Sequence, residues 1–154
     1  MKKIAMLVVS SILLIGTVAC NDAKTSADAP NSTENMSKAP TTETAQNAKN
    51  DATNTVRQDQ LDSDIRAREQ RNNVTGGDAD RANGDLSSEV RSKLEANIPN
   101  GSLTVAAKDG AVMVSGTVQT QNQLNKIEPL AKQIKGVKNV DVTAKVVPAV
   151  PDKK

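Results

Sequence analysis

The chain has 154 residues, of which 36% are hydrophobic and 25% are charged, and it contains no aromatic residue, no histidine and a single cysteine. This composition excludes histidine-based catalysis, an intramolecular disulfide, a zinc site that needs two thiolates, and aromatic stacking platforms for nucleic-acid bases. The formal charge of +2 comes from Lys2 and Lys3, so the rest of the chain is formally neutral and we expect no nucleic-acid partner. We also expect no catalytic residue, metal site or cofactor.

Residues 1–19 have the pattern of an export signal. Lys2 and Lys3 precede an apolar stretch over residues 4–18, which is shorter than the roughly 20 apolar residues of a transmembrane helix. A positive start, a short apolar run and small residues before a cut are typical of a secretory signal peptide. We therefore expect the chain to leave the cytoplasm.

The apolar stretch ends in Thr17-Val18-Ala19-Cys20, which is followed by Asn21. This run resembles the lipobox of bacterial lipoproteins, and the resemblance implies cleavage before Cys20 and acyl chains such as palmitate on that residue. Several chains anchor a protein strongly, because each buried methylene contributes about 0.8 kcal/mol. The alternative is an ordinary cut between small residues that leaves Cys20 as a free thiol. If the rule known for enteric bacteria applies, Asn21 points to the outer membrane.

A polar linker is predicted over residues 20–83. Residues 21–55 consist mostly of Ala, Asn, Thr, Ser, Asp, Lys and Glu, and Met36 is their one large apolar side chain. Such a stretch cannot bury enough apolar surface to offset its ordering entropy, so we expect it to be disordered. About 60 flexible residues would span roughly 40–50 Å and space a folded domain from a membrane.

Within this linker, residues 57–71 are compatible with a short helix. The i, i+4 spacing pairs Asp62 with Arg66 and Asp64 with Arg68. The apolar pair of Leu61 and Ile65 is too narrow to dock firmly, so we expect this helix to stay in solvent.

A folded unit is predicted over residues 84–148, and it begins with a helix. Asp85 or Ser87 can serve as the N-cap. The apolar residues recur at every fourth position: Leu86, Val90 and Leu94. Pro99-Asn100-Gly101 ends the helix.

Two strands joined by a tight turn follow the helix. Apolar and polar residues alternate over residues 102–108 and again over residues 111–118. Asp109-Gly110 between them is a strong hairpin signal, because both positions tolerate positive φ. Gly116 interrupts the second strand and allows another backbone to approach closely. The outward residues are mainly polar, so we expect the outer face of the sheet to be solvated.

Thr120 and Gln123 form a capping box that begins a second helix. The inner stripe of this helix consists of Leu124, Ile127, Ala131 and Ile134. Pro129 removes one backbone hydrogen bond inside the helix, so we expect a kink or a tightened turn there. Gly136 ends the helix. A last strand alternates over residues 140–146, and residues 149–154 are expected to form a disordered tail.

The order helix, strand, strand, helix, strand predicts an α+β domain in which two helices pack on one face of a three-stranded sheet. The strand and turn residues Asp109-Gly110-Ala111-Val112-Met113-Val114-Ser115-Gly116-Thr117-Val118, with Gly136-Val137-Lys138-Asn139-Val140 one helix later, resemble the BON domain (bacterial OsmY and nodulation). The resemblance implies an exported, often lipid-anchored protein that binds phospholipid or other envelope components, and not an enzyme. Some members protect the envelope under osmotic stress.

Four lysines in and after the second helix are candidate contacts for anionic headgroups: Lys126, Lys132, Lys135 and Lys138. Cations at the end of a helix also stabilise its dipole in water, so the alternative is that they bind nothing. Because the chain has no aromatic anchor, any contact with lipid should be electrostatic and sensitive to salt. The three glycines Gly110, Gly116 and Gly136 are expected to be structural.

Two functions follow as hypotheses. The first is a membrane-anchored envelope lipoprotein, facing the periplasm, whose domain binds anionic phospholipid and supports envelope integrity or osmotic tolerance. The second is an envelope adaptor that docks on a protein or cell-wall partner, for example by adding to a sheet edge.

Overall fold

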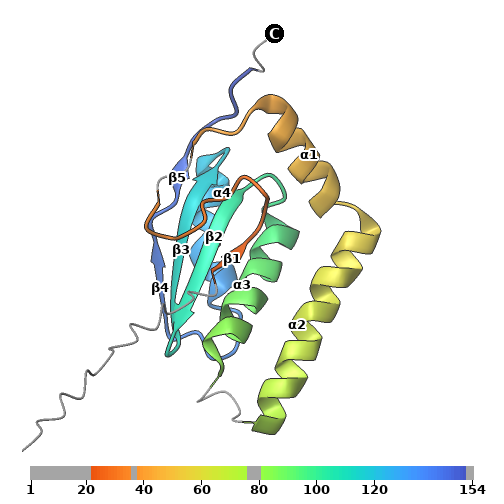
Figure 1. Cartoon of the computed structure of the whole chain (residues 1–154), viewed down its shortest axis with the longest axis vertical. Coiled ribbons are helices and arrows are strands. Elements are labelled where there is room, and N and C mark those ends of the chain that lie inside the picture. The colour runs from red at the N-terminus through yellow and green to blue at the C-terminus, as the bar shows by residue number, and fades with distance from the viewer. Residues whose placement is uncertain (1–21, 36–37, 76–80, 152–154) are drawn as a thin grey trace, which may run out of the picture.

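A mixed β-sheet lies at the centre of the computed structural model, which describes residues 22–35, 38–75 and 81–151 (Figure 1). The export signal and Cys20 lie outside the described residues. In chain order the elements are β1 (Ala23–Lys24), α1 (Thr42–Ala52), α2 (Thr55–Thr75), α3 (Asn83–Asn97), β2 (Ser102–Lys108), β3 (Ala111–Val118), α4 (Gln121–Ala131), β4 (Asn139–Val142) and β5 (Lys145–Val146). None of the helices in these described ranges has the length and apolar character needed to cross a membrane.

The hairpin of β2 and β3 forms the middle of the sheet, whose order is β1-β2-β3-β4, with β5 also paired to β3. β2 and β3 are antiparallel, and Lys108 faces Ala111 across the turn. Asp109 and Gly110 have φ values of 53° and 87°. Two positive φ values in a two-residue turn match the right-handed twist of the strands, so the predicted hairpin is confirmed.

The last strand is divided in two, and both parts run parallel to β3. The register is the same on either side of the break, with Val114 beside Val142 and Thr117 beside Lys145. Gly116 lies opposite the break and has a φ of 124°, outside the range of a regular strand. The irregular backbone at this glycine therefore coincides with the interruption of the parallel ladder.

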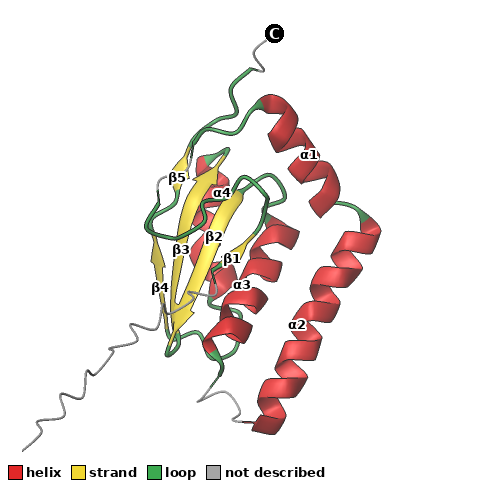
Figure 2. Ribbon diagram, in the orientation of Figure 1, coloured by secondary structure: helices red, strands yellow, loops and turns green. Residues whose placement is uncertain are grey.

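Helices α3 and α4 pack on one face of the sheet, which confirms the predicted α+β class and its helix–strand–strand–helix–strand order (Figure 2). The core between them is aliphatic, and its buried members are Leu86, Val90, Leu94, Ile98, Leu103, Val105, Val112, Val114, Val118, Ile127, Ala131, Ile134 and Ala144. Every residue of this cluster comes from the stretch 86–144. The domain therefore has a core of its own. The apolar residues whose periodicity predicted its helices and strands form that core.

The N-cap predicted for the first helix of the domain is wrong. Helix α3 begins at Asn83, two residues earlier, and Ala82 occupies the N-cap position without a side-chain hydrogen bond. The Asp85 carboxylate instead accepts hydrogen bonds from Arg68 and Arg71, and the Ser87 hydroxyl donates to the carbonyl of Gly84. Asp85 is thus held by arginines of another helix and does not cap its own.

Helix α4 begins with the predicted capping box of Thr120 and Gln123. Pro129 lies inside the helix and does not end it. Backbone hydrogen bonds of the tighter i to i+3 type follow it. The amide of Gln133 donates to the carbonyl of Leu130, three residues back. A tightened stretch therefore follows the proline. The sequence predicted that Gly136 ends this helix. That prediction is wrong, because the helix ends at Ala131 and Lys132 is its C-cap.

The disordered linker predicted over residues 20–83 is wrong for the described part of that range. β1 pairs with β2, and Figure 1 shows residues 25–35 crossing the front of the sheet while α2 lies alongside α3. The hydroxyl of Thr104 donates to the carbonyl of Pro30 at 2.5 Å, and the hydroxyl of Ser26 donates to that of Ser102 at 3.2 Å. These contacts also overturn the prediction of a solvated outer face, because Thr104 is fully buried beneath this segment.

Helix α1 is joined to the end of the chain. Thr41 and Val150 form a parallel β-bridge, in which the amide of Thr42 donates to the carbonyl of Val150 at 2.9 Å. The predicted disordered tail is therefore wrong at residue 150, and residues 152–154 lie outside the described residues. Residues 40–42 and Val150 therefore hold each other through backbone hydrogen bonds that no sequence pattern indicated.

Candidate functional site

Three segments meet where the β2–β3 hairpin turns, and we call this place the turn end. They are the turn itself, residues 135–138 after α4, and the start of α3. The carbonyl of Gly110 accepts a hydrogen bond from the amide of Lys138 at 2.8 Å. The side chain of Asn83 accepts one from the amide of Asp109 at 2.8 Å. These bonds fix the three segments relative to one another.

Glycines allow this close packing. A Cβ on Gly110 would lie 2.9 Å from the carbonyl oxygen of Gly136, and the φ of Gly110 is 87°. Gly136 has a φ of 88°, and a Cβ there would lie 2.5 Å from Cδ of Arg81. Both positions therefore combine a left-handed backbone with close neighbours, a combination that glycine accommodates best.

Of the four candidate lysines, Lys135 and Lys138 lie at the turn end with exposed side chains. The ammonium of Lys138 donates to the carbonyl of Asp109 at 3.3 Å, which directs this side chain along the turn. Lys132 forms an ion pair with Glu128 at 2.5 Å, one helical turn earlier on α4. Lys126 is exposed farther up the same helix. The structure thus brings two of the four together and sets Lys126 apart.

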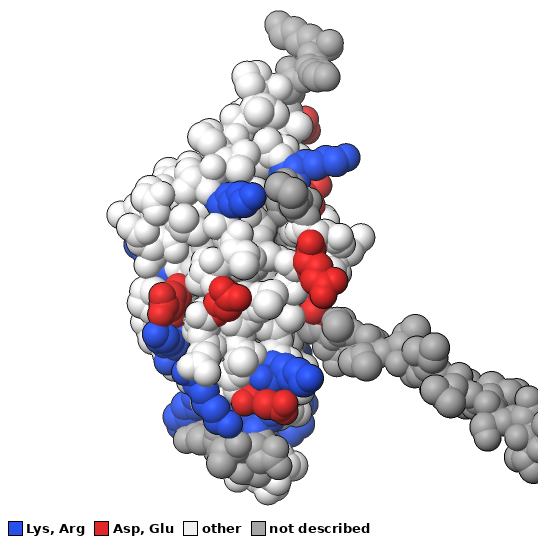
Figure 3. All heavy atoms as spheres, turned by 90° about the vertical axis from the view of Figure 1, so that its left-hand side faces the viewer, with Lys and Arg blue, Asp and Glu red and all other residues white. Residues whose placement is uncertain are grey.

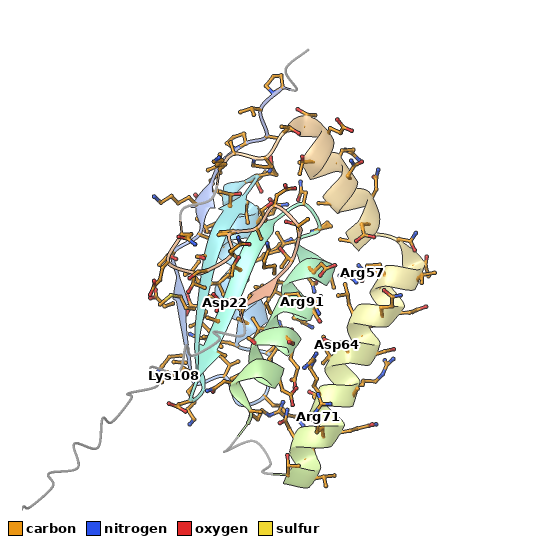
Figure 4. The ribbon with its side chains drawn as sticks, viewed as in Figure 1. Asp22, Arg57, Asp64, Arg71, Arg91 and Lys108 are labelled. Atoms are coloured by element: carbon orange, nitrogen blue, oxygen red, sulfur yellow. The ribbon has the colours of Figure 1, made fainter. Side chains whose placement is uncertain are left out.

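Lys108 is a further cation at the turn end, and it was not among the four lysines predicted from the sequence. It is exposed, it is the last residue of β2, and it pairs with Ala111 across the turn (Figure 4). Its outward position beside a predicted turn was the signal that could have found it. Lysines and arginines gather at the lower end of the face in Figure 3, which is the turn end, while acidic side chains concentrate above it. The exposed carboxylate of Asp109 is a counter-charge in the same place.

A second charged region lies between α2 and α3, where arginines and carboxylates alternate along the interface (Figure 4). We call it the ionic ladder. Its members on α2 are Arg57, Asp64, Arg68, Arg71 and Asn72, and on α3 they are Asp85, Glu89, Arg91, Ser92 and Glu95.

The ionic ladder explains why such a polar helix docks. Asp64 accepts from Arg68 at 2.8 Å and from the hydroxyl of Ser92 at 2.9 Å. Arg57 contacts Glu95 at 2.6 Å, and the Glu95 side chain is only 3% exposed. The arginine partners, with the Arg71 hydrogen bond the largest cause, hold the pKa of Asp85 below its usual value. The predicted pair of Asp64 and Arg68 forms, whereas Arg66 bonds Ser63 instead.

Glu89 is the most deeply buried charge of this interface. Its side chain and that of Arg81 are 0% and 1% exposed, and the two form an ion pair at 2.9 Å. The side-chain amide of Asn72 donates to the same carboxylate at 3.2 Å. Burial raises the pKa of Glu89 to about 7, although Arg81 and Asn72 act in the opposite direction. This carboxylate is therefore held within the fold by Arg81 and Asn72.

A polar hollow of about 490 Å³ lies where β1, α2 and α3 meet. Asp22, Ala23 and Arg68 line it together with the first residues of α3. Ala82 and Gly84, the two chain neighbours of Asn83, also line the hollow, while Asn83 bonds the turn, so the hollow places Asp22 close to the turn end.

The family model of the BON domain matches residues 82–148. Residues 82–148 are a BON domain. The match begins two residues before the boundary predicted from the sequence and covers the whole helix–strand–strand–helix–strand unit. Residues 22–75, with β1, α1 and α2, lie outside the match and are an addition to the BON domain.

A curated relative supports the same assignment over a shorter stretch. Osmotically-inducible protein Y of Escherichia coli (strain K12) is 42% identical over 55 residues, which are 34% of this chain and 27% of that protein. The match thus spans about a quarter of the relative's length.

Proposed function

We propose that this protein is an envelope lipoprotein that acts in osmotic stress tolerance by holding its BON domain against an anionic membrane surface. The observation that carries the proposal is the BON domain at residues 82–148, which is similar to part of an osmotically-inducible protein. The export signal and the lipobox-like run at Cys20 supply the route to the envelope.

The turn end supplies the contact with lipid headgroups in this proposal. Lys108, Lys135 and Lys138 are exposed there, and each cation close to an anionic surface contributes up to about 1 kcal/mol. With no aromatic residue in the chain, the contact stays at the headgroups and weakens as salt screens it. Lys132 contributes less, because Glu128 already neutralises it.

Docking on a protein partner through a sheet edge receives less support. β1 already occupies the edge of β2, and the opposite edge consists of the short strands β4 and β5 with a break between them. An adaptor that adds a strand to this sheet would therefore find a short, interrupted ladder.

The first experiment determines the mature N-terminus. The full chain is produced in a bacterial host, and the mass of its N-terminal peptide is measured in the membrane and soluble fractions. The proposal expects a membrane-bound chain that begins at an acylated Cys20. A soluble chain, or a Cys20 thiol that reacts with a maleimide, contradicts it.

The second experiment tests headgroup binding without the anchor. A chain that starts at residue 20 with Cys20→Ser is floated with vesicles of phosphatidylcholine alone or mixed with phosphatidylglycerol. We expect binding to the anionic vesicles at low salt, reduced about tenfold or more by the triple change Lys108→Gln, Lys135→Gln and Lys138→Gln. The control, Lys38→Gln with Lys49→Gln and Lys145→Gln, changes the net charge equally with exposed lysines elsewhere. Equal binding by the two triple variants contradicts the assignment of the turn end.

A further inference from the structure

The first strand of the sheet, β1, starts at Ala23, only three positions after Cys20 in the sequence. We infer that the domain is held directly against the membrane with its turn end facing the lipid, and that no long flexible linker separates the two. The inference rests on the lipid anchor of the proposed function and adds to it the orientation of the domain and the surface that meets the headgroups.

The beginning of the chain is fastened to the domain by several bonds. Ala23 pairs with Val105 and Lys24 with Thr104 in the antiparallel ladder of β1 and β2. Thr25 extends this attachment, since its hydroxyl donates to the carbonyl of Gly101 at 2.9 Å. The same hydroxyl accepts from the amide of Leu103 at 2.9 Å, and the amide of Thr25 donates to the carbonyl of Leu103 at 2.9 Å. Residues 23–25 are therefore fastened to the edge of the sheet.

The direction of β1 points the anchor towards the turn end. Because β1 is antiparallel to β2, the N-terminal end of β1 at Ala23 points in the direction in which β2 runs from Val105 to Lys108. Asp22 lines the hollow beside Ala82 and Gly84, next to the turn end, and Figure 4 shows it on the side of the sheet that leads down to Lys108. Helix α1 and Val150 lie at the opposite end of the molecule (Figure 1).

Chain geometry limits the distance between the lipid and the domain. Three peptide units connect Cys20 to Ala23, so the Cα atoms of these two residues are at most about 11 Å apart. Along β2, the three steps from Val105 to Lys108 advance about 10 Å in the same direction. The headgroup layer is itself roughly 5–8 Å thick. An acylated Cys20 in that layer therefore favours contact of the turn end with the headgroups over contact of α1.

The charges of the turn end fit an anionic surface. Lys108, Lys135 and Lys138 are exposed there, against the single exposed carboxylate of Asp109 among the described residues of the turn and of 135–138. The anchor and the cations thus favour the same orientation through independent features of the sequence, one at its start and the others in the BON domain.

The experiment measures the depth of two positions in the intact lipoprotein. A fluorescent probe is attached to Ala111→Cys beside the turn or to Asn47→Cys on α1, both exposed positions, and the lipidated chain is reconstituted into vesicles that carry a headgroup quencher. We expect quenching at position 111 to be several-fold stronger than at position 47. Equal quenching at the two positions, with the protein still bound to the vesicles, overturns the orientation and leaves the proposed anchor intact.

A spacer variant is the matched control. Insertion of about 20 Gly and Ser residues between Cys20 and Asn21 keeps the lipid and the domain but adds a flexible span of roughly 25 Å. We expect the quenching at position 111 to fall towards that at position 47. Unchanged quenching at 111 shows that the turn end binds without the short connection and overturns the role given to β1. Failure of the native chain to bind the vesicles overturns the proposed function together with the inference.

Discussion

At Gly116, β3 has no room for a side chain. A Cβ there would lie 2.1 Å from the carbonyl oxygen of Ser102 on β2, and the φ of 124° disfavours any other residue. The clash involves backbone on both sides, so the sheet cannot relieve it by moving a side chain.

We predict that Gly116→Ala lowers the free energy of unfolding by about 3 kcal/mol or more. Ser115→Ala at the neighbouring position is the control, because no described residue bonds to the buried Ser115 hydroxyl. Its effect should stay within about 1 kcal/mol. Thermal unfolding followed by circular dichroism measures both, and similar losses for the two variants would contradict the backbone argument.

Glu89 makes stability depend on pH. Its pKa rises from 4.5 in the unfolded chain to about 7 in the fold, so between these values the folded state binds more protons than the unfolded state. The contribution of Glu89 is therefore most favourable below the unfolded pKa and declines as pH rises to about 7.

We predict that Glu89→Gln removes this decline, which is on the order of 2 kcal/mol. Urea unfolding of the native chain and of the variant between pH 4 and about 8 should give curves that diverge across this window. Glu34→Gln, at an exposed position, serves as the control and should leave the native curve unchanged. Parallel curves for Glu89→Gln and the native chain would refute the assignment.

At the scale of elements, helix α2 shows that a polar helix docks when its partner carries complementary charges. Its apolar contribution is small, with Leu61 buried and Ile65 partly buried. The remaining contacts belong to the ionic ladder, in which Asp64 joins two arginines and Ser92. A single ion pair at the surface contributes little to the free energy of unfolding, but the contributions of a connected network on two facing helices add up.

We predict that Asp64→Asn speeds amide hydrogen exchange over residues 55–75 roughly three- to tenfold, while α3 and the sheet keep their protection. Asp59→Asn changes the same charge at an exposed position of α2 and should leave the exchange rates as they are. Hydrogen exchange with mass spectrometry resolves the segments. The ladder loses its assigned role if the two variants behave alike.

At the scale of the whole molecule, the BON domain and the residues before it contribute separately. The aliphatic core comes from residues 86–144, whereas residues 22–75 add β1, a cover over the outer face of the sheet, and the ionic ladder. The domain should therefore fold without the preceding residues and lose part of its stability, since removal of α2 exposes Asp85, Glu89 and Glu95.

We predict that a chain over residues 81–154 unfolds cooperatively, with a melting temperature several degrees below that of the chain over residues 22–154. Circular dichroism measures both transitions. Loss of cooperative unfolding in the shorter chain would show that residues 22–75 are required for the fold and not an addition to it.

The sequence by itself determined the BON domain. Period-four helices, alternating strands, the Asp109-Gly110 turn and the capping box at Thr120 are local patterns, and the structure contains all of them. The differences lie at the ends of the two helices and in the break between β4 and β5. Local patterns depend on neighbours in the chain, so the sequence contains all the information they need. Lys135 and Lys138 were found as candidates for the same reason.

Only the tertiary structure decided three features. They are the packing of residues 22–75 on the BON domain, the position of Lys108 at the turn end, and the burial of Glu89. Each depends on groups distant in sequence. Thr25 bonds Leu103, Asp64 bonds Ser92, and the amide of Lys138 bonds Gly110 in the turn that follows Lys108. The composition of a polar segment alone predicts disorder. The partners that satisfy its hydrogen bonds and charges lie elsewhere in the chain, so its composition does not reveal them.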